Sequence, residues 1–365
     1  MKRSKSKKKV SFKSRLFYLT ILLTILGIVA VADASAPVAI RVYNDKYFLF
    51  KQQITWAVIG VVSFFVASMT PLKYIKKYSV FVFGISILTL ILVALPGFGS
   101  RFLGARRWLI IGPISIQPSE IVKLGLALYI ARLSESKDDL FAYLIPVLLV
   151  SFLVMLQPDL GTTIIIVVVG AVQIFLAGIP FVYMIIFGGL GVLAGFLLII
   201  LSDYRRERLT TFLDQTQDPL GSGYHIRQVL LGLGSGGLLG VGLGQSKQKF
   251  LFLPEAATDS IFAVIAEEVG FIGGVFIIFL FFLYIYYGFK ILVSADDTFS
   301  KILAGGIIAW IGGQVLLNIA SMVAITPLTG IPLPFFSYGG SSLVMVLTAS
   351  GILVNIGKEN ERSKR

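Results

Sequence analysis

The chain has 365 residues, of which 56% are hydrophobic and only 14% are charged, and its mean hydropathy is +0.89. A soluble domain cannot bury that much apolar surface, so the composition excludes a soluble enzyme and predicts a polytopic membrane protein. The sequence contains no cysteine, which excludes disulfides, a thiol nucleophile and a thiolate metal site.

Much of the net charge of +13 comes from a basic arm over residues 1–15, which holds eight Lys or Arg residues and no acidic one. Apolar residues follow, so the arm is typical of a cytoplasmic anchor on anionic membrane lipid. A nucleic-acid-binding segment is the less favoured alternative. We interpret the apolar run after the arm as an uncleaved first transmembrane span.

Apolar runs of membrane-spanning length continue along the chain. They predict an all-α membrane domain of ten transmembrane helices over residues 16–357, followed by a polar tail over residues 358–365. The predicted spans are 16–36, 52–70, 78–96, 119–133, 141–157, 162–179, 182–202, 259–289, 299–323 and 338–357.

The orientation follows from the cations of short loops. Lys73, Lys76 and Lys77 lie between the second and third spans, and the tail is also basic, so both termini are predicted to be cytoplasmic. The large loop between the seventh and eighth spans, residues 203–258, is then extracytoplasmic. Its many glycines interrupt short apolar runs, which predicts an irregular segment that lies along the membrane interface or dips into it.

Two groups of cations fall on the outer side in this topology. They are either ordinary solvated loop residues or a binding surface for an anionic headgroup on the outer leaflet. The candidates for headgroup contact are Arg101, Arg106, Arg107, Arg205, Arg206, Arg208 and Lys249.

The stretch LPEAATDSIF places two carboxylates, Glu255 and Asp259, where the eighth span begins. Thr258 or Asp259 could cap that helix, with Glu255 complementing the helix dipole. Alternatively, an acid between apolar surroundings and a wet cleft can serve as a general base. The residues of this stretch leave both interpretations open.

A second pair of charges, Glu120 and Lys123, lies at the start of the fourth span. Residues three apart share a helix face, so the two form either a local ion pair or part of the same cleft as Asp259. In the loop before the tenth span, Ser337 and Ser341 either donate hydrogen bonds to a headgroup or belong to a loop shaped by its prolines and glycines.

Other polar residues within or beside the spans point to structural roles. Asp159 follows a proline at a turn and is expected to cap the sixth span. Glu267 and Glu268 lie about two turns into the eighth span and are expected to bond neighbouring elements. His225 is the only histidine, and no His, Asp and Glu residues have convincing metal-ligand spacing.

Five ordered motifs together resemble one known family, the shape, elongation, division and sporulation (SEDS) glycosyltransferases. They are RRWLIIGPISIQPSEIVKL, QPDLGTT, RLTTFLDQTQDPLGSGYHIRQ, GSGGLLGVGLGQSKQKFLFLPEAATDSIFAVIAEEVGFIGG and GIPLPFFSYGGSS. The resemblance covers nearly the whole chain after the basic arm. The wording GLGQSKQKFLFLPEA is closer to the division-type FtsW and its sporulation relative than to the elongation-type RodA.

The resemblance implies a bacterial cytoplasmic-membrane enzyme that polymerises lipid II on the outer face and releases undecaprenyl pyrophosphate. It also implies a class B penicillin-binding protein and other division proteins as partners. The essential acid of the family falls on Asp259, and its Ser-Glu-x-x-Lys pair falls on Glu120 and Lys123. The family's usual histidine is Ala257 here, which weakens any inference about how the pKa of the acid is tuned.

The implied reaction is one inverting displacement, in which the acceptor sugar's 4-hydroxyl attacks the donor's anomeric carbon. One base suffices for this step, and no protein nucleophile is needed. Arginines or a divalent cation such as Mg²⁺ or Mn²⁺ would stabilise the leaving pyrophosphate. A lipid II flippase and a non-catalytic division scaffold remain as alternative functions. The predicted substrate contacts are the cations named above together with Glu255, Ser337 and Ser341.

Overall fold

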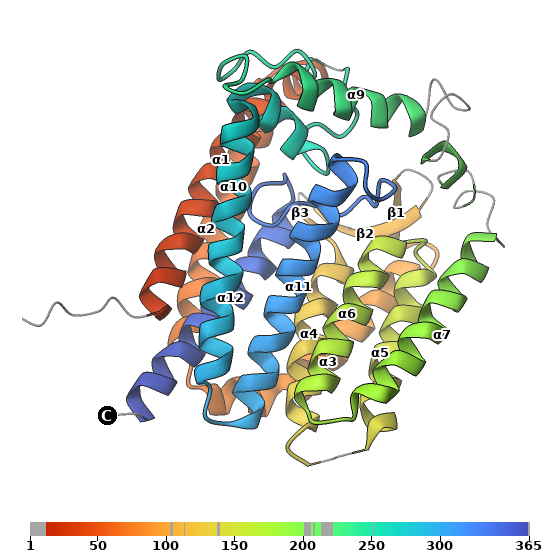
Figure 1. The fold of residues 1–365 in the computed structure, drawn as a ribbon, viewed down its shortest axis with the longest axis vertical. Helices are drawn as coiled ribbons and strands as arrows, with labels where there is room; N and C mark the ends of the chain where they lie inside the picture. The colour runs from red at the N-terminus through yellow and green to blue at the C-terminus, as the bar shows by residue number, and fades with distance from the viewer. Residues whose placement is uncertain are drawn as a thin grey trace, which may run out of the picture.

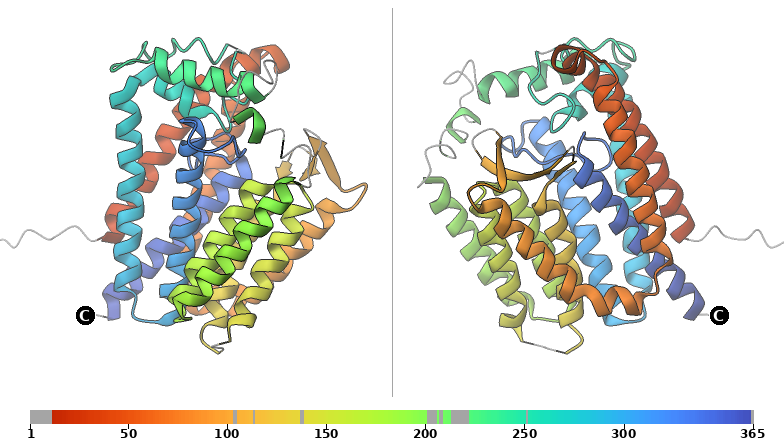
Figure 2. Two further views of the ribbon diagram at one scale, coloured as in Figure 1. Left: turned by 45° about the vertical axis from the view of Figure 1, so that its right-hand side comes forward. Right: turned by 180° about the vertical axis from the view of Figure 1, so that it is seen from behind.

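The structure is a computed structural model that describes residues 12–102, 105–112, 114–136, 139–200, 206, 209–212, 222–250 and 252–363. Figure 1 shows a bundle of long helices with a further helix, α9 (Ser222–Ser235), lying across one end. The C-terminus and the beginning of the first helix lie away from that crossing helix (Figure 2). This arrangement is consistent with two termini on one side of a membrane.

Each predicted span overlaps one helix of the structure. Six helices are long and apolar enough to cross a membrane, and the total of ten transmembrane spans stays a prediction. The helices are α1 (Phe12–Tyr43), α2 (Phe48–Met69), α3 (Leu72–Ala94), α4 (Pro118–Leu133), α5 (Leu140–Met155), α6 (Leu160–Leu176), α7 (Phe181–Ile200), α9 (Ser222–Ser235), α10 (Ile261–Ser294), α11 (Thr298–Met322) and α12 (Gly340–Ser363).

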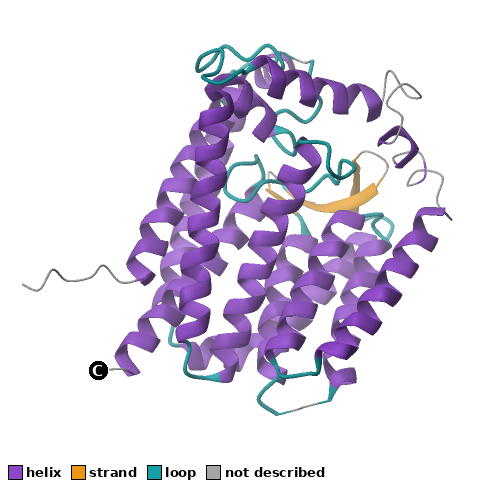
Figure 3. Cartoon of the chain, viewed as in Figure 1, coloured by secondary structure: helices purple, strands orange, loops and turns teal. Residues whose placement is uncertain are grey.

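The prediction of an all-α chain is wrong between α3 and α4, where a small sheet forms (Figure 3). Strands β1 (Gly99–Phe102), β2 (Ala105–Ile111) and β3 (Ile114–Ile116) pair in the order β1-β2-β3, and both pairings are antiparallel. Gly112 joins β2 to β3 with φ +60°, a backbone conformation that glycine adopts without steric cost. Hydropathy alone did not reveal this sheet because its strands are short and lie between two apolar helices.

Helix α4 is short and polar at its start because protein surrounds it. Pro118 occupies the first turn, where its missing N–H leaves no hydrogen bond unmade. The helix packs on α3, α6 and α11, and the side chains on most of its surface are buried, including those of Glu120 and Lys123. Glu120 and Lys123 therefore face other helices, where they can be paired, and do not face lipid.

The chain ends depart from the predicted boundaries. Helix α1 begins at Phe12, so the last residues of the predicted arm are helical, while residues 1–11 lie outside the described part. Helix α12 continues to Ser363, which makes most of the predicted polar tail helical. Lys13 in α1 and Glu361 in α12 form an ion pair with an N–O distance of 2.8 Å. The division into arm, membrane domain and tail stays a prediction.

Helix α1 approaches the loop before α12 at Gly27. A Cβ atom added at Gly27 would lie 2.0 Å from the carbonyl oxygen of Phe335, far inside van der Waals contact. Glycine at this position therefore lets α1 pack directly against the backbone of residues 331–339. That loop also contacts the segment that carries Asp259, as described below.

We predict that Gly27→Val lowers the stability of the protein by about 1–3 kcal/mol, because overpacking forces the Phe335 backbone away. Thermal unfolding in detergent, followed by fluorescence, measures the change. Gly84→Ala in α3 is the matched control, since nothing lies within 4 Å of a Cβ atom there. Equal unfolding temperatures for the two variants would contradict the prediction.

Candidate active site

Asp259 lies one residue before the cap position of α10. The helix begins at Ile261, and Ser260 is its N-cap residue. Thr258 directs its hydroxyl back to Glu255, with 2.7 Å between Thr258 Oγ1 and Glu255 Oε2. Neither Thr258 nor Asp259 therefore occupies the cap position, so the interpretation of either residue as the helix cap is wrong.

The segment before α10 is a tight turn built around Glu255. Its backbone has φ +52°, which is unusual for a residue with a side chain. Its carbonyl oxygen accepts hydrogen bonds from the backbone N–H groups of Thr258 and Ser260, each at 3.1 Å. The Glu255 carboxylate accepts the Thr258 hydroxyl, so this acid closes the turn that presents Asp259.

Donors from two other elements bind three successive carbonyl groups of this turn. The backbone N–H of Tyr338 donates to Ala257 at 2.8 Å, and Ser337 Oγ donates to the Thr258 carbonyl at 2.6 Å. Asn318 Nδ2 on α11 donates to the Asp259 carbonyl at 2.8 Å. The backbone position of Asp259 is therefore fixed by α11 and by the loop before α12.

The carboxylate of Asp259 faces that loop. A Cβ atom added at Gly330, where φ is +71°, would lie 3.5 Å from Asp259 Oδ2. The Asp259 side chain is partly exposed, whereas Ser260 and Ile261 after it are buried. A carboxylate at such a boundary can exchange protons with a bound molecule while its backbone stays fixed.

Glu120 and Lys123 form the local ion pair that their spacing predicts. Lys123 Nζ lies 2.7 Å from Glu120 Oε1 and 2.9 Å from Gln314 Oε1 on α11. It also lies 5.1 Å from the centroid of the Trp310 ring. Glu120 Oε2 is buried and accepts no hydrogen bond within the described residues, so one oxygen of this carboxylate is left for water or a ligand.

Helix α11 connects the Glu120–Lys123 pair to Asp259. Gln314 contacts Lys123, and one turn later Asn318 contacts the backbone of Asp259. Both amides also donate to the loop before α12, Gln314 to the Pro332 carbonyl at 3.3 Å and Asn318 to the Ile331 carbonyl at 2.8 Å. The structure thus joins Glu120, Lys123 and Asp259 into one framework through α11.

Sequence reasoning missed this amide pair, together with two further contacts. Tyr338 donates its hydroxyl to Gln52, and burial raises the pKa of Tyr338 to about 12, so the hydroxyl stays protonated. His225 Nε2 on α9 lies 2.7 Å from Ser260 Oγ, beside Asp259. The amide pair could have been found from the sequence, because Gln314 and Asn318 lie four residues apart in a predicted span, where polar groups need partners.

The arginines predicted to contact a headgroup differ in their contacts and in their exposure. Arg107 in β2 donates to the carbonyl groups of Gln157 and Pro158 at 2.9 and 2.6 Å. Arg106 is half-buried in the same strand, and Arg206 is exposed. Arg101 lies in β1, with its side chain outside the described part of the structure, and Arg205 and Arg208 lie wholly outside it.

Three other predicted contacts form bonds within the protein. Ser337 is buried, and its hydroxyl accepts from the backbone N–H of Leu333 in addition to its bond to Thr258. Ser341 Oγ accepts from the backbone N–H of Gln117 at 3.1 Å, which connects α12 to the start of α4. Lys249 is buried in an ionic cluster with two carboxylates.

Two expectations about other acids can also be compared with the structure. Asp159 caps α6, because its carboxylate accepts the backbone N–H of Thr162 at 3.0 Å and the Thr162 hydroxyl at 2.9 Å. Glu267 and Glu268 are buried and bond to the loop before α10. Within the described residues, no group of three or more His, Asp or Glu side chains could hold a metal ion.

The whole architecture matches a known family. The cell cycle protein family FtsW/RodA/SpoVE matches residues 13–362. The chain belongs to this family. Stage V sporulation protein E of Bacillus subtilis (strain 168) is 41% identical over an alignment of 360 positions that covers 96% of this chain and 98% of that protein. A probable peptidoglycan glycosyltransferase FtsW of Coxiella burnetii is 40% identical over an alignment of 369 positions that covers 96% of this chain and 97% of that protein.

Solved structures of the FtsW/RodA/SpoVE family share the fold. A chain from a peptidoglycan synthase complex that coordinates polymerization and crosslinking superposes with a TM-score of 0.80 at 28% identity, covering 95% of this chain and 98% of that one. The rod shape determining protein RodA of Thermus thermophilus superposes with a TM-score of 0.70 at 27% identity, covering 95% and 96%. The resemblance expected from the five sequence motifs is confirmed at the level of the family.

We predict that Lys123→Met destabilises the protein by about 3–5 kcal/mol, because it leaves the Glu120 charge buried without its partner. The double variant Glu120→Gln/Lys123→Met should recover most of that loss, since no buried charge remains. Thermal unfolding in detergent measures both, with Lys301→Met on the exposed side of α11 as the control. Equal losses in the single and double variants would show that charge pairing is not the cause.

Proposed function

We propose that this protein is a peptidoglycan glycosyltransferase that polymerises lipid II into glycan strands, in the manner named for its FtsW relatives. The observation that carries the proposal is the placement of Asp259. Its backbone carbonyl is bound by Asn318, while its carboxylate lies at a partly exposed position facing Gly330. A fixed backbone at a partly exposed position is suited to a general base.

The proposed reaction is a single displacement with inversion. The 4-hydroxyl of the acceptor sugar attacks the anomeric carbon of the donor, and Asp259 takes the proton of that hydroxyl. The bond from the anomeric carbon to the pyrophosphate oxygen breaks, and undecaprenyl pyrophosphate leaves with the bonding electrons. An α-linked donor gives a β-linked product in one step, so no covalent enzyme intermediate is required.

Glu120 and Lys123 support the base in this proposal through α11. Lys123 holds Gln314, and Gln314 lies one turn from the Asn318 amide that binds the Asp259 carbonyl. Glu120 Oε2, buried without a hydrogen bond inside the described residues, is suited to accept a hydrogen bond from a water molecule. Loss of either charge would therefore affect both packing and catalysis.

The leaving pyrophosphate needs positive charge near it. We assign this role to the predicted arginines other than Arg107, namely Arg101, Arg106, Arg205, Arg206 and Arg208, with a divalent cation such as Mg²⁺ or Mn²⁺ as the other source. Glu255 and Ser337 bond within the turn and loop around Asp259, and Ser341 joins α12 to the start of α4; we assign to all three the positioning of the sugar or headgroup through this framework.

The cellular setting follows from the same proposal. The bundle would cross the bacterial cytoplasmic membrane ten times with both termini inside, which places Asp259 on the outer face. The similarity to a chain of a peptidoglycan synthase complex supports a class B penicillin-binding protein as the partner. The FtsW names among the relatives support a role in cell division.

We predict that Asp259→Asn lowers the rate of glycan polymerisation by about 10²–10⁴-fold, the range typical for loss of a general base. The purified protein with its partner is given labelled lipid II, and polymer is separated by gel electrophoresis. Asp45→Asn is the matched control: it removes an acid from the loop between α1 and α2, where Lys51 is its ion-pair partner.

Undiminished polymer from Asp259→Asn would sink the assignment of the base. Polymer absent from every preparation, alongside movement of labelled lipid II across vesicle membranes, would favour a flippase. Absence of both activities, with the partner still bound, would favour a scaffold.

A further inference from the structure

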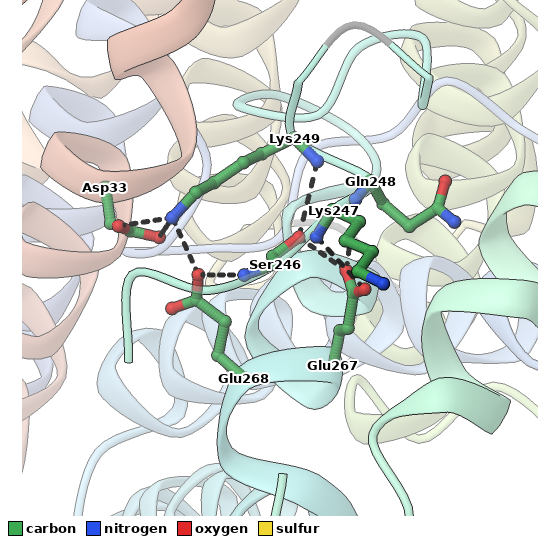
Figure 4. A network of polar contacts seen from close by, with 7 residues as sticks. All are labelled: Asp33, Ser246, Lys247, Gln248, Lys249, Glu267 and Glu268. Carbon is green, nitrogen blue, oxygen red and sulfur yellow. Dashed lines mark hydrogen bonds and ion pairs between the residues drawn. The ribbon is translucent and has the colours of Figure 1, made fainter. Parts of the chain in front are cut away.

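Lys249 is buried in an ionic cluster that joins the loop before α10 to α1 and α10. Its Nζ atom is 2.7 and 2.8 Å from the two carboxylate oxygens of Asp33 on α1, and 2.8 Å from Glu268 Oε1 on α10 (Figure 4). The three hydrogens of the ammonium thus have three carboxylate acceptors. Only 4% of the Lys249 side chain is exposed, which leaves it no surface for a substrate headgroup.

The side chain of Lys249 is positively charged. Burial alone would lower the pKa of this side chain, but hydrogen bonds and charges from Asp33 and Glu268 outweigh burial and raise it above the usual 10.5. Lys249 therefore keeps its proton throughout the physiological pH range, and the cluster does not open by losing it.

The residues next to Lys249 bind α10 through backbone groups. The backbone N–H of Ser246 donates to Glu268 Oε1 at 3.1 Å. The backbone N–H groups of Lys247 and Gln248 donate to Glu267 at 3.1 and 3.3 Å. Residues 246–249 thus surround two adjacent carboxylates of one helix, and we call Asp33, Lys249, Glu267, Glu268 and Ser246 the Lys249 cluster.

Helix α10 is broken directly after this cluster, and the preceding loop fills the break. Gly270 has φ +71° and ψ −174° inside the helix. The backbone N–H groups of Val241 and Gly242 donate to the Glu267 and Glu268 carbonyls at 3.0 and 3.1 Å. In return, the N–H of Phe271 donates to the Gly237 carbonyl at 2.9 Å. The loop therefore supplies partners that the broken helix has lost.

The Lys249 cluster closes the base of the segment that carries Asp259. Lys249 precedes Asp259 by ten residues and Glu268 follows it by nine, and their contact joins the two ends. Asp33 adds a third attachment on α1, the helix that also meets the Phe335 backbone through Gly27. Both supports of the Asp259 turn, the cluster and the loop before α12, thus rest on α1.

We propose that Asp33, Lys249 and Glu268 are positioning residues that hold Asp259 in its reactive place, and that Lys249 does not contact the substrate. This proposal rests on the polymerase function proposed above. Loosening the cluster lets the segment between Lys249 and Glu268 shift, and a small displacement of a catalytic group costs far more in rate than in substrate binding. The cluster therefore acts on kcat and leaves KM for lipid II nearly unchanged.

The test compares Lys249→Met, Asp33→Asn and Lys249→Arg in the purified complex with its partner. Polymerisation rates are measured over a range of lipid II concentrations to separate kcat from KM. We expect kcat to fall about 10- to 100-fold in Lys249→Met, to fall in the same direction in Asp33→Asn, and to recover in part in Lys249→Arg. Lys247→Met is the matched control, because that residue is exposed and binds Glu267 through its backbone N–H.

Thermal unfolding and gel filtration show whether each variant is folded. If Lys249→Met does not fold, Asp33→Asn decides the question, since Lys249 keeps Glu268 as its partner. A raised KM in Lys249→Met with an unaltered Asp33→Asn would overturn the proposal and make Lys249 a substrate contact. Unchanged kcat in folded Asp33→Asn and Lys249→Met would also overturn it. Absence of polymer from the unmutated protein would instead reject the polymerase function itself.

Discussion

The carbonyl groups of the turn before α10 impose the main constraint on this structure. They are buried or partly buried, and donors from the protein satisfy them. The carbonyls of Ala257, Thr258 and Asp259 are bound by Tyr338, Ser337 and Asn318. Each donor comes from α11 or from the loop before α12, so the packing of these elements determines where Asp259 lies.

The same constraint separates the two acids of the stretch LPEAATDSIF. Glu255 stabilises the turn, because its carbonyl and its carboxylate both accept hydrogen bonds from within the segment. The Asp259 carbonyl accepts a hydrogen bond from Asn318, and the Asp259 carboxylate faces Gly330. Ala257 contributes a carbonyl and a small buried side chain. Its place in the turn therefore needs no imidazole.

Hydropathy was enough to predict the helices that the predicted spans overlap, because lipid-facing surface must be apolar and such a helix leaves a continuous signal. It did not predict α9 (Ser222–Ser235), which lies in the loop that was expected to be irregular. Local spacing predicted the Glu120–Lys123 pair and the Asp159 cap for a similar reason, since both are contacts within one turn. The sheet over residues 99–116 was missed because its strands are short and lie between two apolar helices. The amides of α11 were missed because their partners lie far away in the chain, as in the Asn318 contact with Asp259, and no local pattern encodes such distances.

Residue type alone was also not enough to predict which cations bind an anionic ligand. Residue type placed Arg107 and Lys249 among the anion contacts, because cations on the outer side of a membrane protein are natural partners for phosphate. In the structure Arg107 binds the carbonyl groups that precede the α6 cap, and Lys249 neutralises carboxylates of α1 and α10. For these two residues the fold gives an account that needs no substrate. A cation beside lipid must be solvated or paired, so pairing within the protein competes with ligand binding at every such position, and only the geometry decides between them.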